Sequence, residues 1–429
     1  MEINRKNFLF YLALGIAALL FISLIISWIF NFQQVSGTIL TLGFVFLAIG
    51  FHGFKHLKKF AYTIWIFAAV SVSMNYPQYF RELRGVDLKI LIVPLLQIIM
   101  FGMGSQLSVK NFADVIKMPK GVAIGVVCQF TIMPVVGFTV ATLFNFPPEI
   151  AAGIILVGSS PSGLASNVMT FIARANLALS VTLTTVATLL APIMTPSLMK
   201  LLAGRFVPID FWEMMLSIIN IVILPIIAGL IFNAIGYGKE KQKHIYLQII
   251  IFILIIGLKN LINFQTGDVS LQNQMGMFLQ DIMLFQALPI AAAWLFKILS
   301  KGNRAWLDHA LSLISMIGIA VIITIITAAG RDSLIEIGLA LILACLIHNS
   351  LGYFLGYWGC RLLGMKENSC RAVALEVGMQ NGGLASGIAL EMGKVATIGL
   401  APAVFGPMMN VTGSSLANWW RGKSNDPKK

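Results

Sequence analysis

The chain has 429 residues, of which 58% are hydrophobic and only 11% are charged. Because soluble domains carry about 25% charged residues, this composition excludes a soluble globular protein and indicates a polytopic membrane protein. The apolar runs are about 20 residues long, which fits membrane helices rather than the shorter alternating strands of a barrel. The net charge of +13 does not indicate a nucleic-acid partner, because Lys and Arg gather in the short gaps between the apolar runs.

About fourteen hydrophobic segments follow one another along the chain, and each is expected to form a membrane helix. The first segment is too long for the core of a signal peptide and precedes no small-residue cleavage site, so we expect it to be retained. The segments are residues 8–31, 35–51, 60–76, 88–107, 121–144, 149–173, 177–201, 213–235, 244–264, 275–299, 306–329, 333–363, 372–393 and 395–420.

The basic residues predict the orientation of the chain. With the N-terminus in the cytoplasm, the main basic clusters lie on the cytoplasmic side, as the positive-inside rule requires, and the other loops are nearly free of Lys and Arg apart from Arg81, Arg84, Lys89 and a few single residues. The even number of segments also returns the basic tail, residues 421–429, to that side. We therefore expect a multi-pass protein of the inner (plasma) membrane with both termini in the cytoplasm.

Two segments, one in each half of the chain, are interrupted at their midpoints by polar and helix-breaking residues. The interruptions are GSSPSG at 158–163 and GMQNGG at 378–383, and the tetrapeptide Gly-Leu-Ala-Ser occurs at the end of each. Small residues are common at helix contacts, so the matching tetrapeptide alone could be a coincidence. By the loop count, however, the two segments run in opposite directions. Interrupted helices in corresponding positions of two halves indicate a transporter binding site.

Glu376 lies beside the second interruption, at a depth where a charge costs roughly 2.5–3.5 kcal/mol. A broken helix frees backbone carbonyls that can bind a cation and half-helix N-termini that favour an anion. Oxygen ligands with a single carboxylate suit a hard monovalent cation, whereas Ca²⁺ prefers more carboxylates and zinc prefers His or Cys. The oxygen-bearing residues that could join Glu376 are Gln380 and Asn381 in the same stretch and Ser166, Asn167, Ser180 and Thr184 in the other half. Hydrogen bonding between packed helices is the plainer alternative for Ser180 and Thr184.

Three further polar residues can be explained in plainer ways. Asp281 lies within about two turns of an outer boundary, where we expect a structural carboxylate that reaches the boundary or faces the lumen. Ser160, in the first interruption, could be a serine nucleophile with His348 as its base, but no spacing indicates that the two meet. We expect Ser160 to belong to the break and His348 to be a packed polar residue.

Several stretches of the chain together resemble one known family. They are IIMFGMG (98–104), CQFTIMP (128–134), the long stretch at 147–196 with its SNVMT motif, HNSLGYFLG (348–356), LEVGMQNGGLAS (375–386) and NVTGSSLA (410–417). In this order they are similar to the bile acid:sodium symporters, and within them to the bacterial ASBT-like transporters, over residues 58–235 and 303–421. The resemblance implies an inverted-repeat core of ten helices, with a panel domain and a core domain in which two discontinuous helices cross.

The resemblance also implies the residues of three sites. One sodium site is implied to consist of Ser166, Asn167, Ser180, Thr184 and Glu376, and a second of Gln129, Glu376, Gln380 and the carbonyls of Val377 and Met379. The organic anion is implied to lie at the crossing, near Asn381 and Asn410. Leu164 and Met409 are also expected in the substrate region, at positions that are threonine and histidine in some relatives. The sodium residues match the family while the substrate pocket differs, which argues against bile acid itself.

Two helix pairs have no counterpart among the ten helices of the family. We expect an extra N-terminal pair in residues 1–57 and an inserted pair in residues 244–299. Panel helices are expected at 58–107, 213–235 and 306–329, the two halves of the core domain at 121–201 and 333–420, and a cytoplasmic tail at 421–429. The expected fold is therefore an all-α membrane protein.

The expected function is sodium-coupled import of an organic anion, a carboxylate or a bile-acid-like molecule, by alternating access. The alternatives are a sodium/proton antiporter on a similar broken-helix fold, an intramembrane serine protease, and a receptor that binds its ligand without moving it. We expect a transporter rather than an enzyme, with Na⁺ as the coupling ion, no cofactor and no transition metal. The expected partners are Na⁺, a small organic anion and the lipid bilayer, without nucleic acid.

Overall fold

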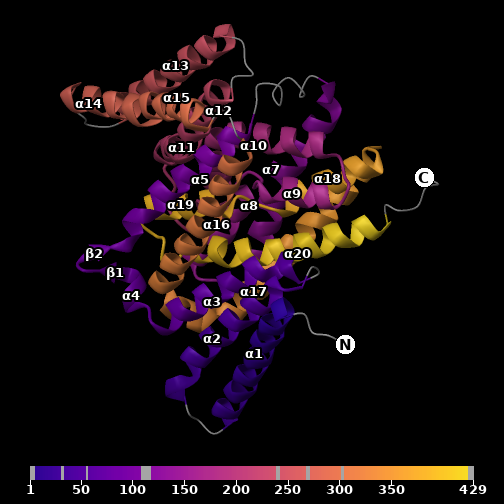
Figure 1. The fold of residues 1–429 in the computed structure, drawn as a ribbon. Coiled ribbons are helices and arrows are strands. Elements are labelled where there is room, and N and C mark those ends of the chain that lie inside the picture. The colour runs from indigo at the N-terminus through magenta and orange to yellow at the C-terminus, as the bar shows by residue number, and fades with distance from the viewer. Residues whose placement is uncertain are drawn as a thin grey trace.

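The computed structural model describes residues 5–29, 33–54, 57–107, 117–237, 242–266, 271–300 and 304–423. These residues are helical almost throughout, apart from one hairpin of two short strands (Figure 1). In chain order the elements are α1 (Arg5–Ile29), α2 (Gln33–His52), η1 (Lys58–Phe60), α3 (Ala61–Asn75), α4 (Gln78–Arg81), β1 (Glu82–Leu83), β2 (Val86–Asp87), η2 (Leu88–Leu91), α5 (Ile92–Gln106), α7 (Pro119–Leu143), α8 (Pro148–Ser159), α9 (Ala165–Ile172), α10 (Leu177–Leu198), η3 (Met199–Ala203), α11 (Phe211–Ile218), η4 (Ile219–Ile223), α12 (Leu224–Gly236), α13 (Gln242–Thr266), α14 (Leu271–Ile282), η5 (Met283–Ala287), α15 (Leu288–Ser300), α16 (Arg304–Ala329), α17 (Arg331–Leu362), α18 (Glu367–Gly378), α19 (Gly382–Glu391) and α20 (Leu400–Lys423).

Each predicted hydrophobic segment overlaps one helix or one run of adjoining helices in the structure. The two interrupted segments correspond to α8 with α9 and to α18 with α19, and the gaps fall at the predicted breaks. Within the described ranges, nine helices are long and apolar enough to cross a membrane. An α-helical polytopic membrane protein is therefore confirmed. The full number of spans and the inverted repeat stay predictions.

The helices form two packed groups, and the broken helices belong to one of them. The first group, α3, α5, α12 and α16, is connected by the packing of α5 on α12 and of α16 on both α3 and α5. The second group consists of α7, α8, α9, α10, α17, α18 and α20, with α19 packed between α20 and α5. These groups are called the panel group and the core group below, after the domains that the sequence predicts; the division into domains itself stays a prediction.

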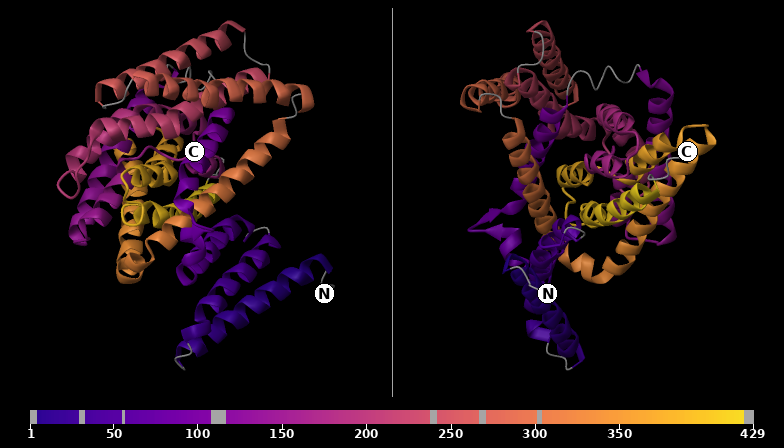
Figure 2. Two further views of the ribbon diagram at one scale, coloured as in Figure 1. Left: turned by 90° about the vertical axis from the view of Figure 1, so that its left-hand side faces the viewer. Right: turned by 45° about the vertical axis from the view of Figure 1, so that its right-hand side comes forward.

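The two helix pairs that the sequence predicts to be additions to the family fold, called the added helix pairs below, lie at opposite ends of the molecule (Figures 1 and 2). At one end α1 packs on α2, and α2 packs on α3 of the panel group. At the other end α13 and the run α14–η5–α15 pack on α12, around a small apolar cluster that includes Leu224, Phe252, Ile256 and Phe285. Both pairs therefore contact the panel group and lie outside the crossing of the broken helices.

Asp281, in the inserted pair, differs from the sequence expectation. Its side chain is buried, and its Oδ2 lies 2.8 Å from Lys259 Nζ of α13. Lys259 also donates to Asn220 Oδ1 of η4 at 3.2 Å, and Asn260 Nδ2 lies 3.4 Å from Asp281 Oδ2. Two opposite charges on adjacent apolar helices satisfy each other, so neither has to reach water. The expectation that Asp281 reaches a boundary or the lumen is therefore corrected.

Candidate functional site

The two broken helices meet at their breaks, where backbone hydrogen bonds join them. Gly163 N donates to Met379 O at 3.0 Å, and Asn381 N donates to Pro161 O at 2.8 Å, so the two stretches form a short antiparallel bridge. In lipid, the backbone N–H and C=O groups that a break frees must find hydrogen-bond partners inside the protein. Here each break supplies partners for some of the freed groups of the other. Polar residues from both halves of the chain are thereby brought to one place.

Local sequence explains why both helices break here. Pro161 has no N–H to donate and its ring clashes with the preceding turn, so α8 ends before it. Gly163 permits the close approach, since a Cβ at this position would lie 2.9 Å from the carbonyl oxygen of Gln380. On the other side, Asn381 Oδ1 accepts from Leu384 N at 3.0 Å and caps the start of α19.

Glu376 of α18, beside the second break, is 2% exposed and is surrounded by four hydroxyl groups. Ser166 Oγ and Ser180 Oγ donate to Oε1 at 2.6 and 2.5 Å. Ser162 Oγ and Thr184 Oγ1 donate to Oε2 at 2.5 and 2.8 Å. The hydroxyls come from the first break, α9 and α10, so the carboxylate of one half is held by oxygens of the other. Such hydrogen bonding lowers the cost of burying its charge.

The oxygen atoms around Glu376 outnumber the hydroxyl hydrogens that could join them. Ser180 Oγ lies 2.8 Å from Asn167 Oδ1 as well as close to Glu376, and Ser166 Oγ lies 2.7 Å from Gly163 O. A hydroxyl has one hydrogen to donate and two lone pairs, so it cannot satisfy two acceptors at once. An oxygen-rich cluster with a single negative charge is suited to a hard monovalent cation, which needs acceptors rather than donors.

The residues of the second predicted group also meet. Gln129 Nε2 of α7 donates to Gln380 Oε1 at 2.8 Å, and Gln380 Nε2 donates to Val377 O at 2.5 Å. Within the described part of the chain, no hydrogen-bond donor reaches Gln129 Oε1, although that atom is buried. Met379 O accepts from Gly163 N in the bridge, but a carbonyl oxygen keeps a second lone pair. These oxygens are of the type that a second hard cation uses, and the second sodium site stays a prediction.

The predicted substrate residues line a single cavity of about 450 Å³ between the two helix groups. On the core side its wall includes Leu164, Asn381, Met409 and Asn410, together with Asn167 of the hydroxyl cluster. On the panel side its polar residues include Tyr62 of α3, Gln106 of α5 and Ser312 and Ser315 of α16. The structure thus places the predicted substrate residues next to the predicted sodium residues.

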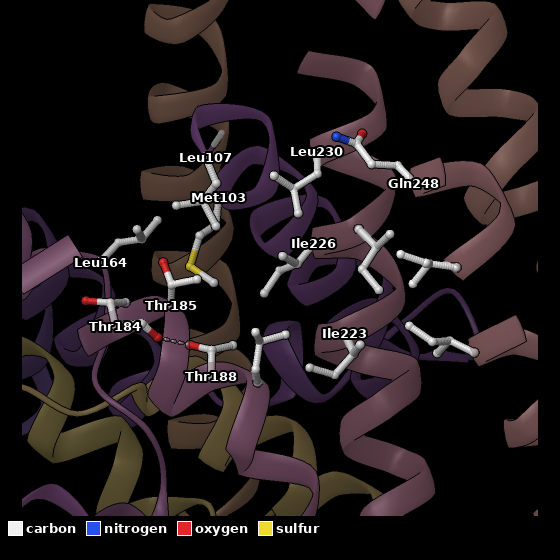
Figure 3. A pocket seen from close by; sticks show the side chains of 14 residues that line it. Met103, Leu107, Leu164, Thr184, Thr185, Thr188, Ile223, Ile226, Leu230 and Gln248 are labelled. Carbon is white, nitrogen blue, oxygen red and sulfur yellow. Dashed lines mark hydrogen bonds between the residues drawn. The ribbon is translucent and has the colours of Figure 1, made fainter. Parts of the chain in front are cut away.

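A second cavity, of about 260 Å³, adjoins the first and is almost wholly apolar (Figure 3). Met103, Leu107 and Leu164 belong to the walls of both cavities. Thr184, which donates to Glu376, lies on the wall at the core side, and Gln248 of the inserted helix α13 lies on the opposite wall (Figure 3). The inserted pair therefore closes space that lies beside the crossing.

Ser160 and His348 do not form a catalytic pair. Ser160 Oγ donates to Leu156 O at 2.8 Å, and His348 Nε2 lies 3.0 Å from Met133 O. The imidazole also packs edge-to-face against Phe405. Each reactive atom is therefore engaged with a backbone carbonyl, as a break residue and a packed polar residue would be.

Comparison with known proteins identifies the family. The model of the sodium/bile acid symporter family matches residues 93–265. The uncharacterized sodium-dependent transporter YocS of Bacillus subtilis is 34% identical over 370 residues, which are 86% of this chain and 93% of that protein. This chain belongs to the sodium/bile acid symporter family. The chain is also similar to the probable chloroplastic sodium/metabolite cotransporter BASS1 of Arabidopsis thaliana. The two are 30% identical over 84% of this chain and 73% of the plant protein. These relatives are named as a transporter and a cotransporter, not as enzymes.

Sequence reasoning missed several residues of the site. Ser162 donates directly to Glu376, and Thr170 Oγ1 lies 3.1 Å from Ser180 Oγ. A signal for Ser162 existed, because it lies inside the first interruption, but that stretch was interpreted only as a backbone break. The panel residues that line the larger cavity gave no such signal, since only tertiary packing brings α5 and α16 to the crossing.

Proposed function

We propose that this member of the sodium/bile acid symporter family imports an organic anion together with Na⁺ bound at Glu376. The observation that carries the proposal is the set of hydroxyls that reach one buried carboxylate across the crossing of two broken helices. Hydroxyl, amide and carbonyl oxygens are ligands for a hard cation, and a bound Na⁺ would neutralise the buried charge. The relatives named as sodium-dependent or sodium/metabolite transporters support Na⁺ as that cation.

The anion is proposed to lie in the larger cavity, beside Asn381 and Asn410. No described Lys or Arg lines this cavity, so the positive potential there must come from other sources. Helices α9 and α19 both begin at the crossing, and the N-terminal end of a helix carries a partial positive charge. Na⁺ bound at the adjoining proposed sites would add further positive charge. Binding of the anion is therefore strengthened when Na⁺ is present, which is the coupling that a symporter needs.

Transport is proposed to proceed by alternating access, with the core group moving against the panel group. The cavity between the groups would open to one side of the membrane and then to the other. With two Na⁺ and a monovalent anion, a tenfold sodium gradient contributes about 1.4 kcal/mol per ion, and 100 mV adds about 2.3 kcal/mol for the net charge. The total of roughly 5 kcal/mol would support an accumulation of several thousandfold.

The test is uptake into proteoliposomes. Carboxylates are first screened for sodium-dependent thermal stabilisation of the purified protein, because a ligand of the folded state raises its apparent stability. The best stabiliser is then assayed for uptake with and without an inward Na⁺ gradient. We expect accumulation only with the gradient, and its loss in Glu376→Gln but not in Glu82→Gln, an exposed acid of the strand hairpin. Equal uptake without Na⁺ would refute the proposal, binding without accumulation would indicate a receptor, and Na⁺/H⁺ exchange without anion uptake would indicate an antiporter.

A further inference from the structure

A groove between α17, α18 and α20 lies apart from the crossing and from both cavities. Its volume is about 510 Å³, and none of its lining residues belongs to the walls of the other two. One face of α17 and one face of α20 form its sides, with i, i+3, i+4 and i+7 spacing that places each set on one side of its helix. The residues of these two faces are Ser350, Tyr353, Phe354, Tyr357 and Trp358 on α17, and Leu416, Trp419, Trp420 and Lys423 on α20.

Two cations are held at one end of this groove. Arg371 of α18 is buried; its Nε donates to Glu367 Oε1 at 2.8 Å, and its guanidinium lies 5.9 Å from the ring centroid of Trp420. Lys423 Nζ lies 3.9 Å from the ring centroid of Trp419. A cation above an aromatic face is attracted to it, so both positive charges have fixed positions.

The acid on the groove wall cancels only one of these two positive charges. Both oxygens of Glu367 are engaged, since Tyr357 OH donates to Oε2 at 2.5 Å and Arg371 Nε donates to Oε1. One negative charge thus faces two positive charges inside the groove. Outside it, the same helix ends carry three more exposed basic residues, which are Arg361, Lys366 and Arg421. The sequence predicts this end to be cytoplasmic.

The remainder of the groove is apolar and aromatic, and its rim is uncovered. Phe354, Trp358 and Trp419 are 58%, 47% and 54% exposed. Tryptophan and tyrosine gather at the level of lipid headgroups, where one end of the ring is wet and the other apolar. From Trp358 to Ser350 the groove follows α17 for about 12 Å, given the helical rise of 1.5 Å per residue. It therefore reaches from headgroup depth into the hydrocarbon.

We propose that this groove binds an anionic phospholipid of the bilayer. The headgroup phosphate lies against Lys423 and Arg371, and an acyl chain lies along Phe354 and Leu416. A basic, aromatic groove between helices complements an anionic headgroup with attached chains, and it favours that headgroup over a zwitterionic one. The bound lipid joins α17 to the C-terminal helix α20. This inference does not depend on sodium coupling, because it uses no residue of the proposed sodium or substrate sites.

The test measures lipid binding to the purified full chain in detergent. Dioleoylphosphatidylglycerol and dioleoylphosphatidylcholine are added in turn, and thermal stabilisation and the bound-lipid stoichiometry by native mass spectrometry are recorded. We expect saturable stabilisation by the anionic lipid only. Lys423→Gln should lower the affinity for the anionic lipid about fivefold, because one basic residue near an anionic surface contributes about 1 kcal/mol. The matched control is Lys297→Gln, which removes an exposed charge at the end of α15 and should leave the affinity unchanged.

A second readout does not depend on stability. Phosphatidylglycerol with brominated acyl chains should quench tryptophan fluorescence, and Trp419→Phe should remove part of that quenching. The proposal is overturned if the two lipids stabilise the protein equally, or if Lys297→Gln weakens binding as much as Lys423→Gln. It is also overturned if free glycerol phosphate stabilises as well as the lipid, because the groove would then be a site for a soluble anion.

Discussion

Glu376 and Asp281 are both buried acids of a membrane protein, but they are stabilised in different ways. Asp281 is paired with the ammonium of Lys259, which cancels its charge permanently. Glu376 is surrounded by neutral hydroxyls, which lower the cost of burial but leave a net negative charge. A permanent counter-charge suits a structural role, whereas a charge that only hydroxyls satisfy can attract a cation that comes and goes. This contrast explains why the first acid is proposed to be functional and the second structural.

At the residue scale, Ser162→Ala should lower the affinity for Na⁺, so that uptake needs a higher Na⁺ concentration. Ser162 donates to Glu376 Oε2 at 2.5 Å, and a hydrogen bond to a charged group contributes about 1.5–3 kcal/mol, or roughly tenfold or more in affinity. The measurement is the Na⁺ concentration that gives half-maximal uptake. The control is Ser197→Ala in α10, whose hydroxyl donates to the carbonyl of Ile193 in its own helix and is exposed. An unchanged half-maximal Na⁺ concentration in Ser162→Ala would show that this hydroxyl is not part of the cation site.

At the element scale, the two breaks depend on each other, because their backbones are joined. Gly163→Ala should separate them, since the new Cβ would lie 2.9 Å from the carbonyl oxygen of Gln380. We expect a loss of sodium-dependent uptake with the protein still folded in detergent. Gly338→Ala in α17 is the matched control, because a Cβ there meets no atom of the described residues within 4 Å. Normal uptake by Gly163→Ala would mean that the bridge tolerates displacement and does not position the site.

The inserted helices are expected to be fixed by their buried ion pair. Lys259→Met or Asp281→Leu alone leaves one charge without its partner, which should destabilise the protein by about 3–5 kcal/mol. The double substitution removes both charges and should be less destabilising than either single change. Chemical unfolding of the purified variants in detergent measures this. If the double variant is as unstable as the sum of the single variants, the pair has no net coupling and does not fix the helices.

The sequence predicted the elements well where the signal was local. Long apolar runs located the helices, and the two polar interruptions located the gaps between α8 and α9 and between α18 and α19. Contacts between distant elements were harder to predict. Lys259 and Asp281 lie in different apolar runs, and only the packing of α13 on the following helix shows that they pair. The hydroxyl of Ser162 was missed because a break is recognised from its backbone chemistry, whereas the direction of a side chain depends on the fold.

At the scale of the whole molecule, the larger cavity lies between the panel group and the core group, while the hydroxyl cluster lies within the core group. This separation gives a physical basis for the proposed mechanism: Na⁺ can be held within one moving body while the anion lies at the surface where the two bodies slide. The added helix pairs both contact the panel group, so they enlarge one body without entering the crossing. We expect them to hold the panel group in the bilayer as the core group moves.

Glu376 and the hydroxyls around it are proposed to bind the coupling Na⁺. The most direct measurement is equilibrium binding of radioactive Na⁺ to the purified protein, with Glu376→Gln and Glu82→Gln measured in parallel. We expect saturable binding by the unmodified protein and by Glu82→Gln, and loss of binding in Glu376→Gln, which removes the charge while keeping the shape of the side chain. Equal Na⁺ binding by all three proteins would contradict it.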